Sequence, residues 1–194
     1  MEYVIENAKK YDIVKEPFEH LYIENFLPNE FYLKFTESIN KLDWWLDDNK
    51  NKRSEWNRYT ICNHYQIDYL NNDIIKEYNK LFLNETFQRY FLDRFSYKKS
   101  NGLPKRIHSQ LDRLKNGMTH ALHCDKEPKY LTFVHYLAED NYHLDLGTKV
   151  YDSYKNYIKT APYKSNCVTI FAPSNNDQLK TWHNMKMNVP YYER

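Results

Sequence analysis

The sequence predicts an α+β protein, mainly β, in which N-terminal helices pack on the outside of a β-sandwich or barrel. Two observations predict this class. Apolar residues recur at helical spacing only in the first half of the chain. Beyond Gly102 and Pro104 the chain changes to short runs rich in β-branched and aromatic residues. Because the strands come last and together, we expect them to carry the functional site.

The first strand and the first helix are predicted from the residues that follow a polar leader. Residues 18–26 form an apolar run typical of a strand. A helix then opens at Pro28 and Asn29, since proline is favoured at a helix start. Four apolar residues at helical spacing indicate that one face of this helix is buried: Phe31, Phe35, Ile39 and Leu42.

The rest of the helical half, which we take to end at residue 104, contains a loop and a long helical pattern. Residues 43–58 are charged and Asn-rich, and they are predicted as a loop whose tryptophans either plug the core edge or cover a site. Residues 72–95 show helical periodicity. They form either one long helix or two short helices with a break near Asn84.

Residues 105–194 are predicted to form the β core, which shares a single domain, residues 1–194, with the helical half. The chain contains no internal repeat. Six strands are expected: Ile107–Leu114, Met118–Cys124, Tyr130–Leu137, Thr148–Tyr151, Cys167–Phe171 and Leu179–Met185.

Composition and charge exclude several classes of protein and partner. With 41% hydrophobic and 17% aromatic residues, the chain can bury a real core. The net charge of +2 comes from interspersed acidic and basic residues, which does not indicate a nucleic-acid partner. No apolar run approaches the roughly 20 residues of a membrane helix, and the N-terminus lacks a signal-peptide core. We therefore expect a cytoplasmic protein without a membrane partner, and the sequence leaves its oligomeric state open.

Two His-x-Asp triplets are candidate metal ligands, because residues i and i+2 of a strand point to the same side. His123 and Asp125 close one predicted strand and precede the strongly apolar run 130–137. His143 and Asp145 lie in a polar segment, where surface exposure is expected. The context favours the first triplet.

His183 is the candidate third ligand, since it lies on a strand-like segment after the apolar run 167–173. Two imidazoles and one carboxylate on one face of iron leave three positions open for a bidentate 2-oxoacid and oxygen. A zinc hydrolase needs one open position, and its usual HExxH helix is absent from the sequence. The other histidines, at 20, 64, 108, 135 and 143, are expected to be structural. His120 is an odd number of residues from His123, so a regular strand would turn it to the opposite face.

Over roughly residues 110–194 the chain resembles the 2-oxoglutarate and Fe(II)-dependent oxygenases, in particular their prolyl-hydroxylase-like branch. In the first half, only the strand followed by NFLPNEF is similar to the family's opening strand and helix. The matching residues occur in the family's order: Asn116-Gly117, His123-x-Asp125, Leu131-Thr132, Tyr136-Leu137, Leu146-Gly147-Thr148, Val150-Tyr151, Asn166, Ile170-Phe171 and Trp182-His183.

The resemblance implies a double-stranded β-helix, a jelly-roll or cupin-like fold, with the N-terminal helices packed outside. It makes His123, Asp125 and His183 both the ligands of Fe(II) and the catalytic residues. Tyr136 and Thr132 stand where relatives hold 2-oxoglutarate. Arg194, eleven positions after His183, is the candidate for its distal carboxylate, which a guanidinium fork matches.

The implied activity is a dioxygenase that uses 2-oxoglutarate and O2 to hydroxylate a C–H bond, with release of succinate and CO2. The substrate is a small molecule or a peptide, such as a peptidyl proline, an amino acid, or a sugar- or nucleotide-linked intermediate. Two alternatives stay open. The barrel could bind or sense a small acid or sugar without turnover, or its tyrosines could stack on nucleic-acid bases. The odd count and irregular spacing of Cys62, Cys124 and Cys167 indicate free thiols.

Overall fold

The computed structural model describes residues 1–41, 56–64, 72–95, 102–104, 107–114, 119–125, 129–138, 143–172 and 180–186. Its helices are α1 (Glu2–Ala8), α2 (Asn29–Asn40), α3 (Asp73–Leu83), α4 (Glu85–Arg94) and a short 3-10 helix at Leu144–Leu146. Its strands are β1 (His20–Ile23), β2 (Trp56–His64), β3 (Ile107–Leu114), β4 (Thr119–His123), β5 (Thr132–Tyr136), β6 (Lys149–Tyr151), β7 (Tyr157–Thr160), β8 (Cys167–Phe171) and β9 (His183–Lys186).

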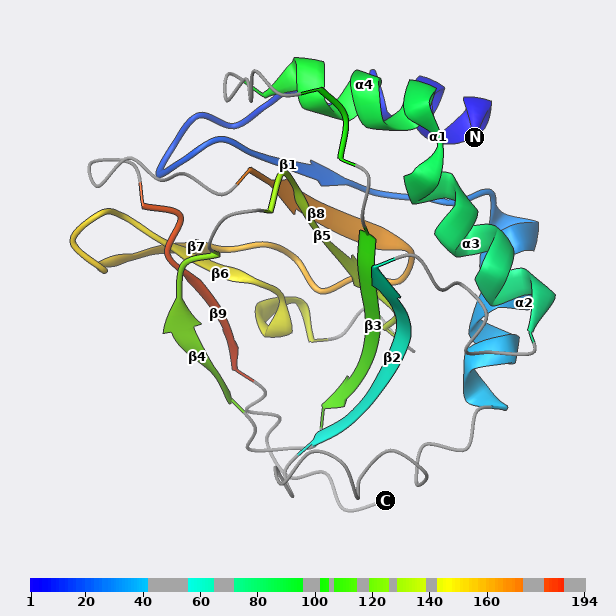
Figure 1. Cartoon of the computed structure of the whole chain (residues 1–194). Coiled ribbons are helices and arrows are strands. Elements are labelled where there is room, and N and C mark those ends of the chain that lie inside the picture. Colours follow the sequence, from blue (N-terminus) through cyan, green and yellow to red (C-terminus); the bar gives the residue numbers. More distant parts are fainter. Residues whose placement is uncertain are drawn as a thin grey trace.

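The strands form antiparallel sheets in an α+β arrangement, which confirms the predicted class. One sheet has the order β1-β8-β5, a second has the order β4-β9-β6-β7, and β2 pairs with β3. From β4 onward the chain passes between the first two sheets at β5, β6, β8 and β9, and only β6 and β7 are consecutive strands of one sheet. This alternation is compatible with a β-sandwich. The helices lie along the outer side of the β1-β8-β5 sheet (Figure 1).

Asparagine caps explain why the helical pattern of residues 72–95 divides into two helices. The side chain of Asn72 accepts a hydrogen bond from the backbone N–H of Ile75, and the side chain of Asn84 accepts one from Phe87. Each asparagine therefore acts as an N-cap. Asn84 also ends α3 in an extended conformation, so the break expected near this residue is confirmed.

Three elements differ from the sequence prediction. The polar leader contains α1, which buries Val4 and Ala8 although it is only seven residues long. Strand β2 begins at Trp56, inside the segment predicted as a loop, while Trp44 and Trp45 lie outside the described residues. Strand β7 was not predicted, because its first two residues are exposed and its sequence lacks an apolar face.

The β1-β8-β5 sheet is covered on both faces, which separates a large core from a small one. On β8, Val168 and Ile170 join the core between the sheet and the helices. The next residue, Phe171, points the other way and joins a small apolar cluster with Phe18 and Val150. This division follows from the period of two along a strand. Polar side chains of β5 and β8 lie on the inner face, and one of them, Thr132, contacts the site described next.

Candidate metal centre

His123, Asp125 and His183 come together in the folded chain as the sequence predicts. One potential ligand atom from each side chain lies within 4.8 Å of the other two. His123 is the last residue of β4 and His183 is the first residue of β9, and the two are direct partners in the antiparallel register. Their ring centroids are 4.3 Å apart. Asp125 follows two residues after His123, and one of its oxygens, Oδ1, lies 4.0 Å from Nε2 of His123.

Backbone carbonyls orient both imidazole rings. Nδ1 of His123 lies 2.8 Å from the carbonyl oxygen of Ala121, and Nδ1 of His183 lies 2.9 Å from that of Thr181. A carbonyl only accepts, so each Nδ1 must carry the proton. When such a ring is neutral, its Nε2 has a free lone pair, which is the form in which histidine binds a metal.

The charges of the site suit a cation. Burial lowers the pKa of His183 to about 4, so this ring is neutral at pH 7. Burial of Asp125 works to raise its pKa, but hydrogen bonds from Lys129 and Thr132 outweigh burial and hold the pKa of this carboxyl below its usual range. Lys129 donates to Oδ1 and Thr132 donates to Oδ2. One neutral imidazole, one carboxylate and the ring of His123 therefore converge.

The three ligands differ in their access to solvent. His183 and Asp125 are buried, whereas the side chain of His123 is 46% exposed. The ring of Phe171 packs on the buried histidine with a centroid distance of 4.6 Å. The site is thus closed on the side of the small inter-sheet core and open on the side of His123.

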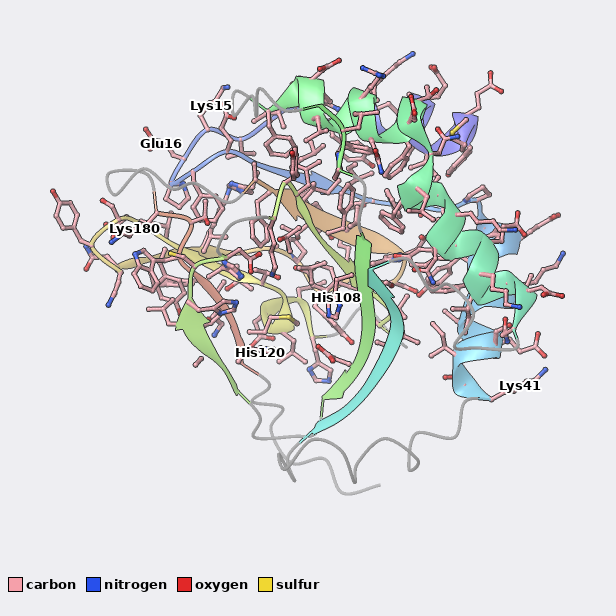
Figure 2. All side chains as sticks on the ribbon, viewed as in Figure 1. Lys15, Glu16, Lys41, His108, His120 and Lys180 are labelled. Carbon is pink, nitrogen blue, oxygen red and sulfur yellow. The ribbon has the colours of Figure 1, made fainter. Side chains whose placement is uncertain are left out.

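A bulge in β4 overturns the argument that placed His120 on the face opposite His123. Met185 pairs with His120 and His183 pairs with His123, so three steps on β4 match two steps on β9. The extra residue brings the two β4 histidines to a centroid distance of 6.5 Å. His120 lies between β4 and β3 (Figure 2), with Nε2 3.8 Å from Oδ2 of Asp112. It is a neighbour of the triad and not a member of it.

Of the three residues predicted to hold 2-oxoglutarate, Thr132 and Tyr136 have contacts that the structure describes. Thr132 hydrogen-bonds to Asp125. Tyr136 is buried, and its hydroxyl lies 2.7 Å from Oγ1 of Thr148 and 2.9 Å from Oγ1 of Thr169. Thr132 and Tyr136 share the inner face of β5 because they are four residues apart. Arg194 lies outside the described residues.

Several other histidines and cysteines named from the sequence have defined surroundings. His135 faces the helices, where its Nδ1 lies 3.1 Å from the hydroxyl of Tyr78. His20 is buried with Nδ1 2.8 Å from the carbonyl oxygen of Phe18. Cys124 and Cys167 are free thiols, as predicted. The side chains of His64 and Cys62 lie outside the described residues.

From the sequence, Lys129 could line a substrate entrance, and a solvated lysine is the default expectation. The structure instead places its ammonium group on Asp125, inside the site. The only indication was its spacing from Asp125, which is four residues.

Neither the family models nor the curated proteins that we compared with this chain gave a match. No helix in the described part of the chain is both long and apolar enough to cross a membrane. The chemistry of the site must therefore be argued from its own residues.

The donor set fits a transition metal better than Mg²⁺ or Ca²⁺. Two imidazoles with one carboxylate suit iron and related ions, whereas Mg²⁺ and Ca²⁺ take oxygen ligands. Among the described residues, this is the only group of three or more histidine, cysteine or acidic side chains close enough to share a metal. Because it supplies three ligands, such a site leaves positions open for other molecules.

Proposed function

We propose that this protein is an Fe(II)- and 2-oxoglutarate-dependent dioxygenase that hydroxylates a C–H bond of a small-molecule or peptide substrate. The observation that carries the proposal is the convergence of His123, Asp125 and His183 within 4.8 Å. Two histidines and one carboxylate are the ligand set of non-haem Fe(II) oxygenases, which need open positions for cosubstrate and oxygen.

The proposed fold is a double-stranded β-helix, within a single domain of residues 1–194. The sheet orders β1-β8-β5 and β4-β9-β6-β7 support it, because a jelly roll alternates its strands between two facing sheets. The triad also supports it, since β4 and β9 are neighbours in one sheet although 59 residues separate His123 from His183 (183 − 123 − 1). In the proposed fold, β3 is the first strand of the β-helix, and the N-terminal helices pack on the outside of the β-helix.

In the proposed centre, the chain's own residues provide geometry and charge. His123 and His183 would bind the metal through Nε2, with their Nδ1 protons held by the carbonyls of Ala121 and Thr181. Asp125 would supply the single negative charge. Bound Fe(II), with 2-oxoglutarate and O2, would supply the oxidising chemistry, and succinate and CO2 would be released.

Different hydrogen bonds support the proposed roles of Thr132 and Tyr136 at the 2-oxoglutarate site. Thr132 would orient Asp125, because its hydroxyl donates a hydrogen bond to Oδ2 of that carboxylate. Tyr136 keeps its hydroxyl among Thr148 and Thr169 on the inner side of the sheet. We propose that this buried hydroxyl cluster faces the cosubstrate, and that Arg194 binds the distal carboxylate.

The main experiment is an anaerobic titration of the purified protein with Fe(II) and then 2-oxoglutarate. We expect the weak visible charge-transfer band of the iron chelate, and O2-dependent conversion of 2-oxoglutarate to succinate. His183→Ala should abolish the band, whereas His143→Ala, which removes the histidine of the second His-x-Asp triplet, should leave it unchanged. If wild-type protein binds Fe(II) but forms neither band nor succinate, the proposal fails.

A non-catalytic binding or sensing protein for a small acid or sugar is the second candidate. The observation that favours it is Lys129, whose ammonium group supplies a positive charge at the triad without any metal. Calorimetric titration of the metal-free protein with 2-oxoglutarate distinguishes the two. Binding with equal affinity with and without Fe(II) would support the binding protein.

A further inference from the structure

Lys129 occupies the oxygen of Asp125 that a metal ion would need. Its Nζ contacts Oδ1, and Oδ1 is the oxygen 4.0 Å from Nε2 of His123. The other oxygen, Oδ2, accepts from Thr132. Lys129 therefore stands on the histidine side of the carboxylate, whereas Thr132 stands on the far side.

Lys129 and a metal ion cannot both hold Oδ1 of Asp125. An ammonium group and a metal ion at the same oxygen would repel each other at close range, so each excludes the other.

The side chain of Lys129 is suited to leave, whereas Thr132 can stay. The lysine side chain is 51% exposed, and its flexible stem can carry the ammonium into solvent. Without either cation, Asp125 would be a buried carboxylate with no compensating charge, which is strongly unfavourable. The two cations therefore serve the same carboxylate in alternation.

We propose that Lys129 is a positioning residue that exchanges with the metal ion at Asp125 and then pairs with an anionic ligand of the metal. This inference rests on the metal centre proposed above. Without a metal ion, Lys129 pairs with Asp125 and holds its side chain in place. When a divalent metal replaces it, the ion, the carboxylate and the released ammonium together carry a charge of about +2. A dicarboxylate such as 2-oxoglutarate balances that charge, so the exchange favours a dianionic ligand over a neutral one.

The test measures the affinity of Mn²⁺, a redox-stable probe, for wild-type protein and for Lys129→Met by calorimetry. Removing the competing ammonium should tighten Mn²⁺ binding by about tenfold. Lys159→Met on β7 is the charge-matched control and should change the affinity by less than about twofold. Lys129→Arg keeps the cation and should bind Mn²⁺ like wild type. Thermal unfolding with saturating Mn²⁺ checks that each variant is folded.

A second arm repeats the titrations with saturating 2-oxoglutarate. In wild type the dicarboxylate should increase Mn²⁺ affinity by a larger factor than in Lys129→Met, because only wild type offers the released ammonium as a partner. Equal Mn²⁺ affinity of Lys129→Met and Lys159→Met would overturn the exchange. An equal effect of 2-oxoglutarate on wild type and Lys129→Met would overturn the pairing with the ligand. If wild-type protein bound no Mn²⁺ or Fe(II) at all, the proposed metal centre itself would fail, which is a distinct result.

Discussion

The ring of Phe171 packs against the ring of His183 with a centroid distance of 4.6 Å and an interplanar angle of 57°. Phe171 is fully buried in the small core between the sheets, so one residue joins the packing of this core to the orientation of a proposed metal ligand. Changes at this position should therefore affect both stability and metal binding.

Phe171→Leu should lower the free energy of unfolding by about 1 to 2 kcal/mol and weaken Mn²⁺ binding by about threefold to tenfold. The reason is that leucine leaves part of the ring volume empty beside His183. Urea unfolding and calorimetry measure the two effects. Phe91→Leu in the helix-side core is the matched control, and it should reduce stability alone. Equal metal affinity in both variants would contradict this coupling.

His123→Ala should weaken metal binding by at least about a hundredfold, because the centre loses one of three ligands. His120→Ala is the control on the same strand, and its affinity should stay within about threefold of wild type. Both substitutions remove one imidazole from β4, and both rings lie on the same face beyond the bulge. A larger loss in His120→Ala than in His123→Ala would show that the triad has been assigned wrongly.

Thr132→Val should raise the pKa of Asp125, since one of the hydrogen bonds that hold this pKa down would be lost. The substitution keeps the shape of the side chain and removes only the hydroxyl. We expect metal affinity to fall by about tenfold at pH 6 to 7. Carboxyl NMR titration of the metal-free protein gives the pKa. Thr160→Val on β7 is the control and should change neither quantity.

His135 should make the metal-free protein less stable in acid. Burial lowers the pKa of His135 to about 4, and its Nε2 is enclosed without a hydrogen-bond partner. In the unfolded chain the pKa is near 6.5, so stability from this group is present above pH 6.5 and is lost as the pH falls toward 4. Between pH 7 and 5 the loss should be about 1 to 2 kcal/mol.

His135→Phe isolates that contribution in urea unfolding at the two pH values. His183, whose pKa is also about 4, keeps a similar dependence in the variant. We therefore expect the variant to lose less stability than wild type between pH 7 and 5, by about 1 to 2 kcal/mol. Phenylalanine suits the position, because the rings of Phe26, Phe35 and Tyr78 surround it. An unchanged pH dependence would contradict the assignment.

Gly147→Ala should lower the free energy of unfolding by about 3 kcal/mol or more, or prevent folding. A Cβ at this position would lie 1.7 Å from the carbonyl oxygen of Ala161 and 2.8 Å from its carbonyl carbon. Gly102→Ala is the control, since a Cβ there meets open space and only the positive φ of 80° is unfavourable. Gly102→Ala should cost about 1 kcal/mol. Comparable stability of the two variants would contradict the close approach of Ala161.

Elements of the fold could be predicted where their own residues show the apolar pattern of a helix or a strand. Cys167–Phe171 has the expected bounds because it is a largely apolar run between turn residues, and Ile107–Leu114 also has the expected bounds although most of its residues are polar. Strand β7 could not be predicted, since its pairing with β6 does not depend on a buried face. Strand β2 could not be predicted, because it begins inside the charged segment 43–58 and pairs along its length with β3, which is distant in the sequence.

The triad could be predicted because two of its members are i and i+2 near a strand end and the third follows an apolar strand. Two other features of the site could not. The bulge that moves His120 depends on the register between β4 and β9, which no local pattern reveals. The contact of Lys129 with Asp125 depends on how the chain turns before β5.

The β1-β8-β5 sheet acts as a partition between two kinds of interior. Apolar packing against the helices stabilises its outer face, so β5, which places Thr132 beside Asp125, is held from the helical side. Polar side chains on the inner face take no part in that helix-side packing. A protein descended from this chain could therefore bind a different substrate after a few changes among these inward-facing side chains, while its fold stayed the same.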